Sequence, residues 1–131
     1  MTFIDTSAIF AFLDTEDDAH ARALGEWERA TDHAEAVVTT NYVLAETIAL
    51  CQSRLGIAAV QDLAARVIPA LSVEWITEDV HTAALATVLT ANRRDLSLVD
   101  CTSFEIMRRL GITRAFALDD HFREQGFEVV P

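Results

Sequence analysis

Short apolar runs and longer amphipathic segments alternate along the whole chain. The short runs at 2–4, 36–39, 72–76, 115–118 and 127–130 are bounded by polar or turn residues, which is typical of buried strands. Between them, helical spacing of apolar positions occurs at 6–13, 18–31, 41–55, 57–70, 78–93, 98–110 and 120–125. Because strands alternate with helices, we expect an α/β fold with a parallel sheet covered on both faces.

Turn and capping residues support these boundaries. Gly56, Gly111 and Gly126 each follow a helical pattern, as C-terminal caps do. Thr77 and Ser97 have the character of N-caps, and the run from Ser97 to Asp100 has the form of a capping box. The 131 residues contain no linker or repeat, so we expect a single domain over 1–131.

Acidic residues follow two of the predicted strands. Asp5 comes directly after the first strand, and Asp119 comes directly after the fourth. Parallel sheets bind ligands beyond the carboxyl ends of their strands, so both residues are candidates for a site. Each has an alternative role as a helix N-cap, and Asp120 is an alternative to Asp119. We prefer Asp119 because it is the first residue beyond the predicted strand.

Two further acidic residues project from predicted helices. Glu46 shares a helical stripe with Tyr42 and Leu50, so we expect it to be half-buried, and no basic residue at spacing three or four can pair with it. Asp100 is the third residue of the predicted capping box. One of its oxygens can accept a backbone N–H while the other binds a metal, so the two roles are compatible.

Four carboxylates at one edge of a sheet would repel one another. Two unit charges about 4 Å apart at an effective dielectric near 20 cost roughly 4 kcal/mol. A hard divalent cation removes this cost, and Mg²⁺ or Mn²⁺ favours oxygen ligands. Such a cation can promote displacement at phosphorus. Asp5, Glu46, Asp100 and Asp119 therefore predict a metal-dependent site for phosphodiester hydrolysis.

Net charge makes the approach to a nucleic acid the least explained part of this prediction. The formal net charge is −11, and a surface of that sign repels RNA at long range. All ten basic residues are Arg, so any mechanism that needs a catalytic Lys is excluded. By their clustering, Arg93, Arg94, Arg108 and Arg109 are candidates for offsetting the field locally, and a solvated helix end is the alternative.

The remaining sequence features favour the cytoplasm. Cys51 and Cys101 form no CxxC pair, which indicates free, buried thiols in a reducing compartment. We expect no signal peptide, and the longest stretch without Asp, Glu or Arg, 80–92, is too short to span a membrane. The four His show no ligand spacing, so no zinc site is expected. His121 adjoins the acidic cluster and either orders a carboxylate or packs as an ordinary side chain.

The ordered set of acidic motifs resembles the PIN domain family, in particular the VapC-type toxins of bacterial toxin–antitoxin pairs. The resemblance covers nearly the whole chain and rests on four segments: Phe3-Ile4-Asp5-Thr6-Ser7-Ala8, Thr40-Asn41-Tyr42-Val43-Leu44-Ala45-Glu46, Leu98-Val99-Asp100 and Ala117-Leu118-Asp119-Asp120-His121-Phe122. The pair Asp119-Asp120 departs from the family pattern, in which one acid is often followed by a varied residue.

This resemblance implies a three-layer α/β/α sandwich and an endoribonuclease that depends on Mg²⁺ or Mn²⁺. It also implies a homodimer and a cognate antitoxin that blocks the site, often with an Arg or Lys among the acidic residues. Asp5, Glu46, Asp100 and Asp119 would be the acidic ligands. Thr6 or Ser7 would be the supporting hydroxyl beside Asp5, and Asp120 would support or replace Asp119.

Three other functions remain as alternatives. A haloacid-dehalogenase-like phosphohydrolase needs a second Asp where this chain has Ser7, and it uses a Lys. A response-regulator receiver domain also uses a Lys. An inactive PIN-like binding module is the main non-enzyme alternative, and the intact set of four acids argues against it.

Overall fold

A five-stranded parallel sheet forms the centre of the protein. The structure is a computed structural model that describes residues 1–131. The strands are β1 (Thr2–Ile4), β2 (Val37–Thr40), β3 (Ser72–Glu74), β4 (Arg114–Phe116) and β5 (Glu128–Val130). Their order in the sheet is β3-β2-β1-β4-β5, and every neighbouring pair is parallel. The predicted α/β class with a parallel sheet is therefore confirmed.

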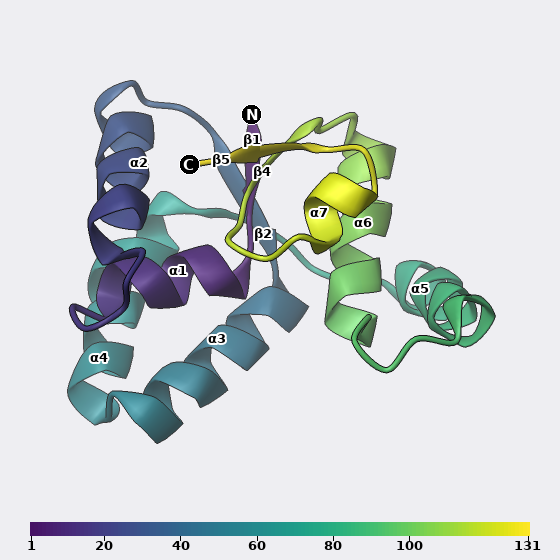
Figure 1. Ribbon diagram of the computed structural model, residues 1–131, viewed down its shortest axis with the longest axis horizontal. Coiled ribbons are helices and arrows are strands. Elements are labelled where there is room, and N and C mark those ends of the chain that lie inside the picture. Colours follow the sequence, from purple (N-terminus) through teal and green to yellow (C-terminus); the bar gives the residue numbers. More distant parts are fainter.

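Helices cover both faces of this sheet. They are α1 (Thr6–Leu13), α2 (His20–Asp32), α3 (Asn41–Arg54), α4 (Ile57–Asp62), α5 (Glu78–Ala91), α6 (Leu98–Leu110) and α7 (His121–Glu124). Figure 1 shows α1, α2 and α4 on one side of the strands and α5, α6 and α7 on the other. The sheet is thus the middle of three layers, and most predicted element ends lie within two residues of the observed ones.

Two strands pass into helices without a loop, and both do so at the same edge of the sheet. Asp5 directly follows β1 and caps α1, where its carboxylate accepts the N–H of Ser7. Thr40 ends β2 and caps α3, where its hydroxyl accepts the N–H of Val43 at 3.1 Å. Because capping residues leave the strand with extended backbone and start the helix at once, α1 and α3 begin side by side.

The predicted helix over 57–70 is not a single α-helix. After α4, the chain widens into the π-helical segment η1 (Leu63–Val67) and then tightens into the 3₁₀ turn η2 (Ile68–Ala70). Pro69 has no N–H to donate, and a proline ring clashes with the carbonyl four residues earlier in a regular helix. The α-helical pattern therefore cannot continue through this position.

The fourth strand ends earlier than predicted. β4 stops at Phe116, although the N–H of Ala117 still donates to the carbonyl of Val130 at 3.1 Å. The N–H of Leu118 instead donates to Oγ of Ser7 at 3.0 Å. Asp119 consequently lies three residues beyond β4, and the expectation that it directly follows the strand was wrong.

Aromatic packing fixes the short helix that follows Asp119. Phe122 is fully buried, and its ring meets Phe104 of α6 edge-on at 5.1 Å and Phe3 of β1 at 6.1 Å between centroids. Burying a Phe side chain contributes roughly 1.5–3 kcal/mol. These contacts hold α7, and with it the Asp119 loop, against β1 and α6.

The predicted capping and thiol features are confirmed. Thr77 caps α5, and Ser97 and Asp100 form both bonds of the capping box of α6. Cys51 and Cys101 are free and buried. No helix of the structure combines the length and apolar character needed to cross a bilayer.

Candidate functional site

Asp5 is a buried carboxylate at the carboxyl end of the central strand. Only 4% of its surface is exposed. Its Oδ2 accepts two hydrogen bonds from Ser7, one from the backbone N–H at 3.2 Å and one from the hydroxyl at 2.8 Å. Its Oδ1 accepts none, and no Arg or His forms an ion pair with it. Asp5 thus combines the N-cap role with one free, buried oxygen.

Ser7 rather than Thr6 is the hydroxyl that supports Asp5. Oγ of Ser7 donates to Asp5 and accepts the N–H of Leu118, so it links β1 to the loop beyond β4. Thr6 lies in a separate buried network, in which its hydroxyl donates to the carbonyl of Val43 at 3.3 Å and accepts from Thr47 at 3.0 Å. Thr6 therefore fixes α1 against α3 and makes no contact with the carboxylate.

Asp100 has the same division between a fixed and a free oxygen. Its Oδ2 accepts the N–H of Ser97 at 3.1 Å within the capping box, and its Oδ1 accepts no hydrogen bond. Burial raises the pKa of Asp100, and the negative charge of Asp119 raises it further. The bonds from Ser97 and the charge on His121 act in the opposite direction.

Asp119 and Asp120 differ sharply in their surroundings. Oδ1 of Asp119 accepts the N–H of His121 at 3.0 Å, which leaves Oδ2 free, and the residue is half-buried. Asp120 stands at the N-cap position of α7, but its side chain makes no cap bond. That side chain is 84% exposed and pairs with Arg123 at 3.3 Å. Asp119 is therefore the member of the pair that belongs to the cluster.

The three aspartates act on one another electrostatically. The pKa of Asp5 is raised to about 7, first by burial and then by the charge of Asp119, with a smaller contribution from Asp100. The hydrogen bonds from Ser7 oppose this rise. No group of three acidic, His or Cys side chains is close enough to enclose a metal ion. The three carboxylates therefore influence one another's pKa values without forming a complete set of metal ligands.

Glu46 is not half-buried, contrary to the sequence-based expectation. It is exposed, makes no hydrogen bond or ion pair, and is absent from the charges that shift Asp5. The buried side of α3 consists of Val43, Leu44, Thr47 and Cys51. Thr47 looks polar in the sequence, but its hydroxyl is satisfied by the carbonyl of Val43 at 2.7 Å, so it packs inward. This places the true buried stripe to one side of Glu46.

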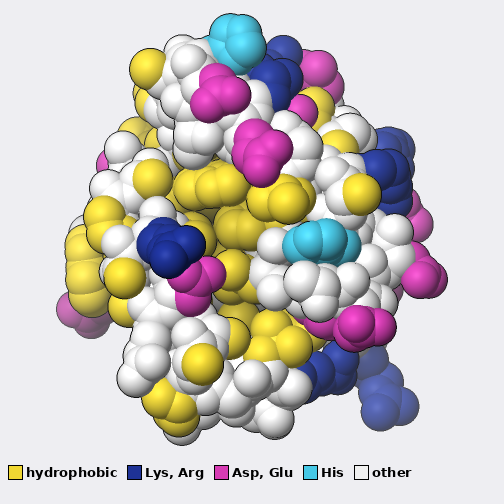
Figure 2. Space-filling model, turned by 90° about the vertical axis from the view of Figure 1, so that its left-hand side faces the viewer, with side chains coloured by type: hydrophobic (Ala, Val, Ile, Leu, Met, Phe, Trp, Pro, Cys, Tyr) yellow, Lys and Arg dark blue, Asp and Glu magenta, His cyan; other side chains and the backbone are white.

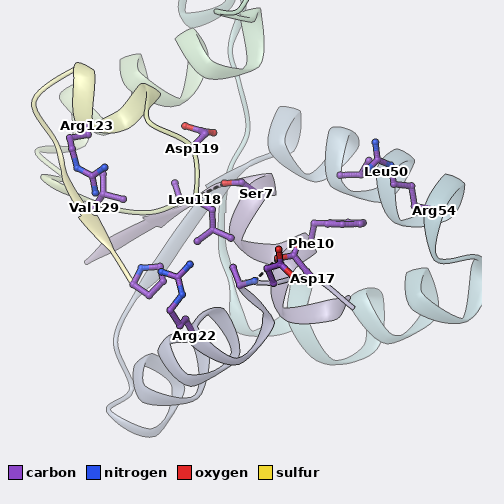
Figure 3. Close-up of a pocket in the computed structure, with 14 residues that line it drawn as sticks. Ser7, Phe10, Asp17, Arg22, Leu50, Arg54, Leu118, Asp119, Arg123 and Val129 are labelled. Atoms are coloured by element: carbon purple, nitrogen blue, oxygen red, sulfur yellow. Dashed lines mark hydrogen bonds between the residues drawn. The ribbon is translucent and has the colours of Figure 1, made fainter. Parts of the chain in front are cut away.

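A groove of about 620 Å³ opens beside Ser7 and Asp119. Figure 3 shows Arg22, Arg54 and Arg123 around it, contributed by α2, α3 and α7. This grouping could not be predicted from the sequence, because the three positions are far apart in the chain and only the fold brings them together.

The four arginines that cluster in the sequence do not lie beside the carboxylates. Arg93 pairs with Asp95 and Glu124, and Arg109 pairs with Glu105 and Asp79. The remaining two lie outside the groove: Arg108 bonds to Gln125 and packs over Phe104 and Phe127, and Arg94 is exposed. None of them lines the groove beside the carboxylates.

Comparisons with known proteins agree on one family. A family model described as the PIN domain matches residues 2–128. The 23S rRNA-specific endonuclease VapC20 of Mycobacterium tuberculosis, from strains CDC 1551 / Oshkosh and ATCC 25618 / H37Rv, is 38% identical over 133 residues, which span 100% of this chain and 99% of the relative.

Solved structures give the same result. The crystal structure of Mycobacterium tuberculosis VapC20, described as a Sarcin-Ricin loop cleaving toxin, has a TM-score of 0.87 and 37% identity, with 100% of both chains covered. FitAcB from Neisseria gonorrhoeae has a TM-score of 0.71 over 100% of this chain and 97% of that chain. At 14% identity, this second likeness shows the fold alone.

Proposed function

Because this chain belongs to the PIN domain family, we propose that it is an endoribonuclease that hydrolyses phosphodiester bonds with Mg²⁺ or Mn²⁺ at Asp5, Asp100 and Asp119. One observation carries this proposal. Each of these carboxylates has one oxygen held by an N–H or O–H group and one oxygen without a hydrogen bond. Side chains fixed in this way retain a free donor atom for a metal.

The donor set fits a hard divalent cation. All candidate donors are carboxylate oxygens, which suit Mg²⁺ and Mn²⁺ better than softer metals. Asp5 is buried with no basic partner, although buried charges are normally paired or bind metals. Glu46 is the fourth proposed ligand, and its exposed side chain forms no hydrogen bond or ion pair that would hold it elsewhere. When bound, the cation would lower the pKa of water and neutralise charge on the reacting phosphate.

The protein's own groups provide the positioning. Ser7 holds Asp5 and the Leu118 backbone in one hydrogen-bonded unit, so the β1 and β4 sides of the site keep a fixed spacing. Ser97 holds Asp100 at the first turn of α6. Packing of Phe122 in the core fixes the loop that carries Asp119. Rigid supports of this kind limit the reorganisation needed at the reacting phosphate.

The names of its relatives suggest a specific substrate and role. We propose that this chain is the toxin of a type II toxin–antitoxin pair and that it cleaves 23S ribosomal RNA in the sarcin–ricin loop. Identity of 38% over the full length of VapC20 supports this assignment. An inactive binding module would need no free carboxylate oxygens, and Lys-dependent phosphohydrolases do not suit a chain without Lys.

Cleavage of RNA by protein stripped of metal with EDTA tests this function. We expect an oligonucleotide that carries the sarcin–ricin loop, and intact 23S RNA, to be cut only after Mg²⁺ or Mn²⁺ is added. Denaturing electrophoresis measures the products, and Asp5→Asn protein purified in the same way controls for contaminating nucleases. Undiminished cleavage in EDTA, or binding of the RNA without cleavage under both metals, would contradict the proposal.

We propose that this protein acts in the cytoplasm. We also propose that it binds two protein partners, each through an apolar part of its surface. On α5, Leu85 and Leu89 are 42% and 71% exposed, and we propose that this face joins two copies. Figure 2 shows a hollow of hydrophobic side chains on the face of α1, α2 and α4. We propose that the antitoxin covers this hollow and places a basic side chain among the carboxylates.

Light scattering tests the homodimer. The wild type should have a mass of about 29 kDa, twice the 14.5 kDa of one chain, and Leu89→Glu should halve it because a charge would be buried in the interface. Ile57→Glu, at a 55% exposed position on α4, is the matched control and should remain a dimer. A wild type of 14.5 kDa would contradict the dimer.

A further inference from the structure

Most arginines of this protein are neutralised by nearby acids. Six of the ten form ion pairs with carboxylates, and these are Arg29, Arg66, Arg93, Arg109, Arg114 and Arg123. Four do not, and these are Arg22, Arg54, Arg94 and Arg108. Two of the unpaired four, Arg22 and Arg54, line the groove that contains Ser7 and Asp119.

The local charge of this groove departs from that of the whole molecule. Its lining contains three aspartates (Asp17, Asp18, Asp119) and three arginines (Arg22, Arg54, Arg123). With Asp120, the partner of Arg123, the side-chain charge here is −1, while the chain carries −11. A polyanion would therefore meet less repulsion here than on the surface as a whole.

An aromatic ring lies beneath one of the free arginines. The guanidinium carbon of Arg54 is 6.0 Å from the centroid of the Phe10 ring, and both residues line the groove. Proteins that bind unpaired nucleotides combine such rings, on which bases stack, with arginines that follow the backbone. Figure 3 shows Phe10 and Arg54 at one end of the groove and Asp119 at the other.

We infer that this groove binds an unpaired segment of the RNA substrate, with Arg22 and Arg54 on its phosphates and Phe10 against a base, and so leads the scissile phosphate to the carboxylates. The inference rests on the proposed ribonuclease function and adds the residues that hold the substrate. A volume of about 620 Å³ lies within the range of small-molecule sites and leaves room for roughly one or two nucleotides. The arginines also explain how an acidic protein admits RNA.

The double variant Arg22→Gln/Arg54→Gln tests this inference. Both side chains are exposed and form no ion pair, and the Arg54 contact with Phe10 is a surface contact, so the thermal midpoint should change little. We expect KM for RNA to rise about tenfold while kcat changes little, because the lost contacts position the substrate without touching the reacting atoms. The slope of the logarithm of the RNA association constant against the logarithm of the salt concentration should become shallower by about 1.4. This corresponds to about 0.7 for each of two phosphate contacts to single-stranded RNA.

Arg66→Gln/Arg94→Gln is the matched control, since it removes the same charge outside the groove. The two double variants should be compared in EDTA for binding of a fluorescein-labelled 12-nucleotide single-stranded RNA, and with Mn²⁺ for cleavage. Equal KM values and equal salt slopes for the two double variants would contradict the proposal that this groove binds RNA. If the wild type binds this RNA through Arg22 and Arg54 yet cleaves neither it nor the sarcin–ricin oligonucleotide with Mn²⁺, the ribonuclease proposal fails while the groove stands.

Discussion

Replacing Asp5 by Asn should abolish RNA cleavage and leave the metal-free protein more stable. The amide keeps an oxygen that can accept the hydrogen bonds of Ser7, so the local geometry should survive. It removes the negative charge that the proposed metal binding requires, and we expect kcat/KM to fall roughly a thousandfold or more. A single-turnover cleavage assay and thermal unfolding in EDTA measure the two effects.

The gain in stability follows from the raised pKa of Asp5. This pKa is about 7 in the folded protein and 3.8 in the reference state, so between these values the folded form binds more protons than the unfolded form. The free energy of unfolding of the wild type should therefore fall by at most ~4 kcal/mol as pH rises from about 4 to 7. Above about pH 7 it should level off. In Asp5→Asn this fall should shrink to the smaller part that Asp100 contributes.

An exposed aspartate provides the control for both effects. Asp18→Asn removes the same charge from the surface and should change neither cleavage nor the pH dependence of unfolding by much. The account of Asp5 would be wrong if Asp5→Asn cleaved RNA normally, or if it unfolded several degrees below the wild type at pH 8 in EDTA.

Asp119→Asn should lower kcat/KM about a hundredfold or more, whereas Asp120→Asn should change it no more than about threefold. The two acids are adjacent, but only Asp119 raises the pKa of Asp5. The Asp120 side chain is 84% exposed and has only a surface ion pair with Arg123. Steady-state cleavage rates of the two variants, prepared in parallel, decide between them.

The same pair of variants has a second readout. Removal of the Asp119 charge should lower the pKa of Asp5 below about 7, because the charge of Asp119 is the second largest cause of that shift. Carboxyl carbon resonances followed by NMR against pH would measure it. A larger loss of cleavage in Asp120→Asn than in Asp119→Asn would show that Asp119 is not the metal ligand of this pair.

Local rules were sufficient for most of the fold. Alternating strands and helices predicted the parallel sheet, and the Ser97–Asp100 capping box was correct to the residue because both of its bonds lie within one turn. The segment 57–70 departed from a regular helix at Leu63, ahead of Pro69, and the proline itself was a visible signal that the helix could not continue. The end of β4 could not be predicted, since it depends on a bond from the N–H of Leu118 to Ser7, 111 residues earlier.

The site was predictable where it depended on local sequence and was missed where it depended on tertiary contacts. Asp5 has strand and helix on either side, so its position at the sheet edge followed from the sequence. Glu46 was misplaced because Thr47, which looks polar, is buried by hydrogen bonds that include one to Thr6, 41 residues away. Arg22 and Arg54 come from different helices, and only the three-dimensional groove brings them together.

We propose that carboxylates anchored on Asp5 hold a divalent cation that RNA cleavage requires. The most direct test follows the initial rate of cleavage of the sarcin–ricin oligonucleotide as Mn²⁺ is titrated into EDTA-treated wild type and Asp5→Asn protein. We predict a saturable rise from zero for the wild type and no rise for the variant. A rate independent of Mn²⁺, or an equal rise in both proteins, would contradict the account.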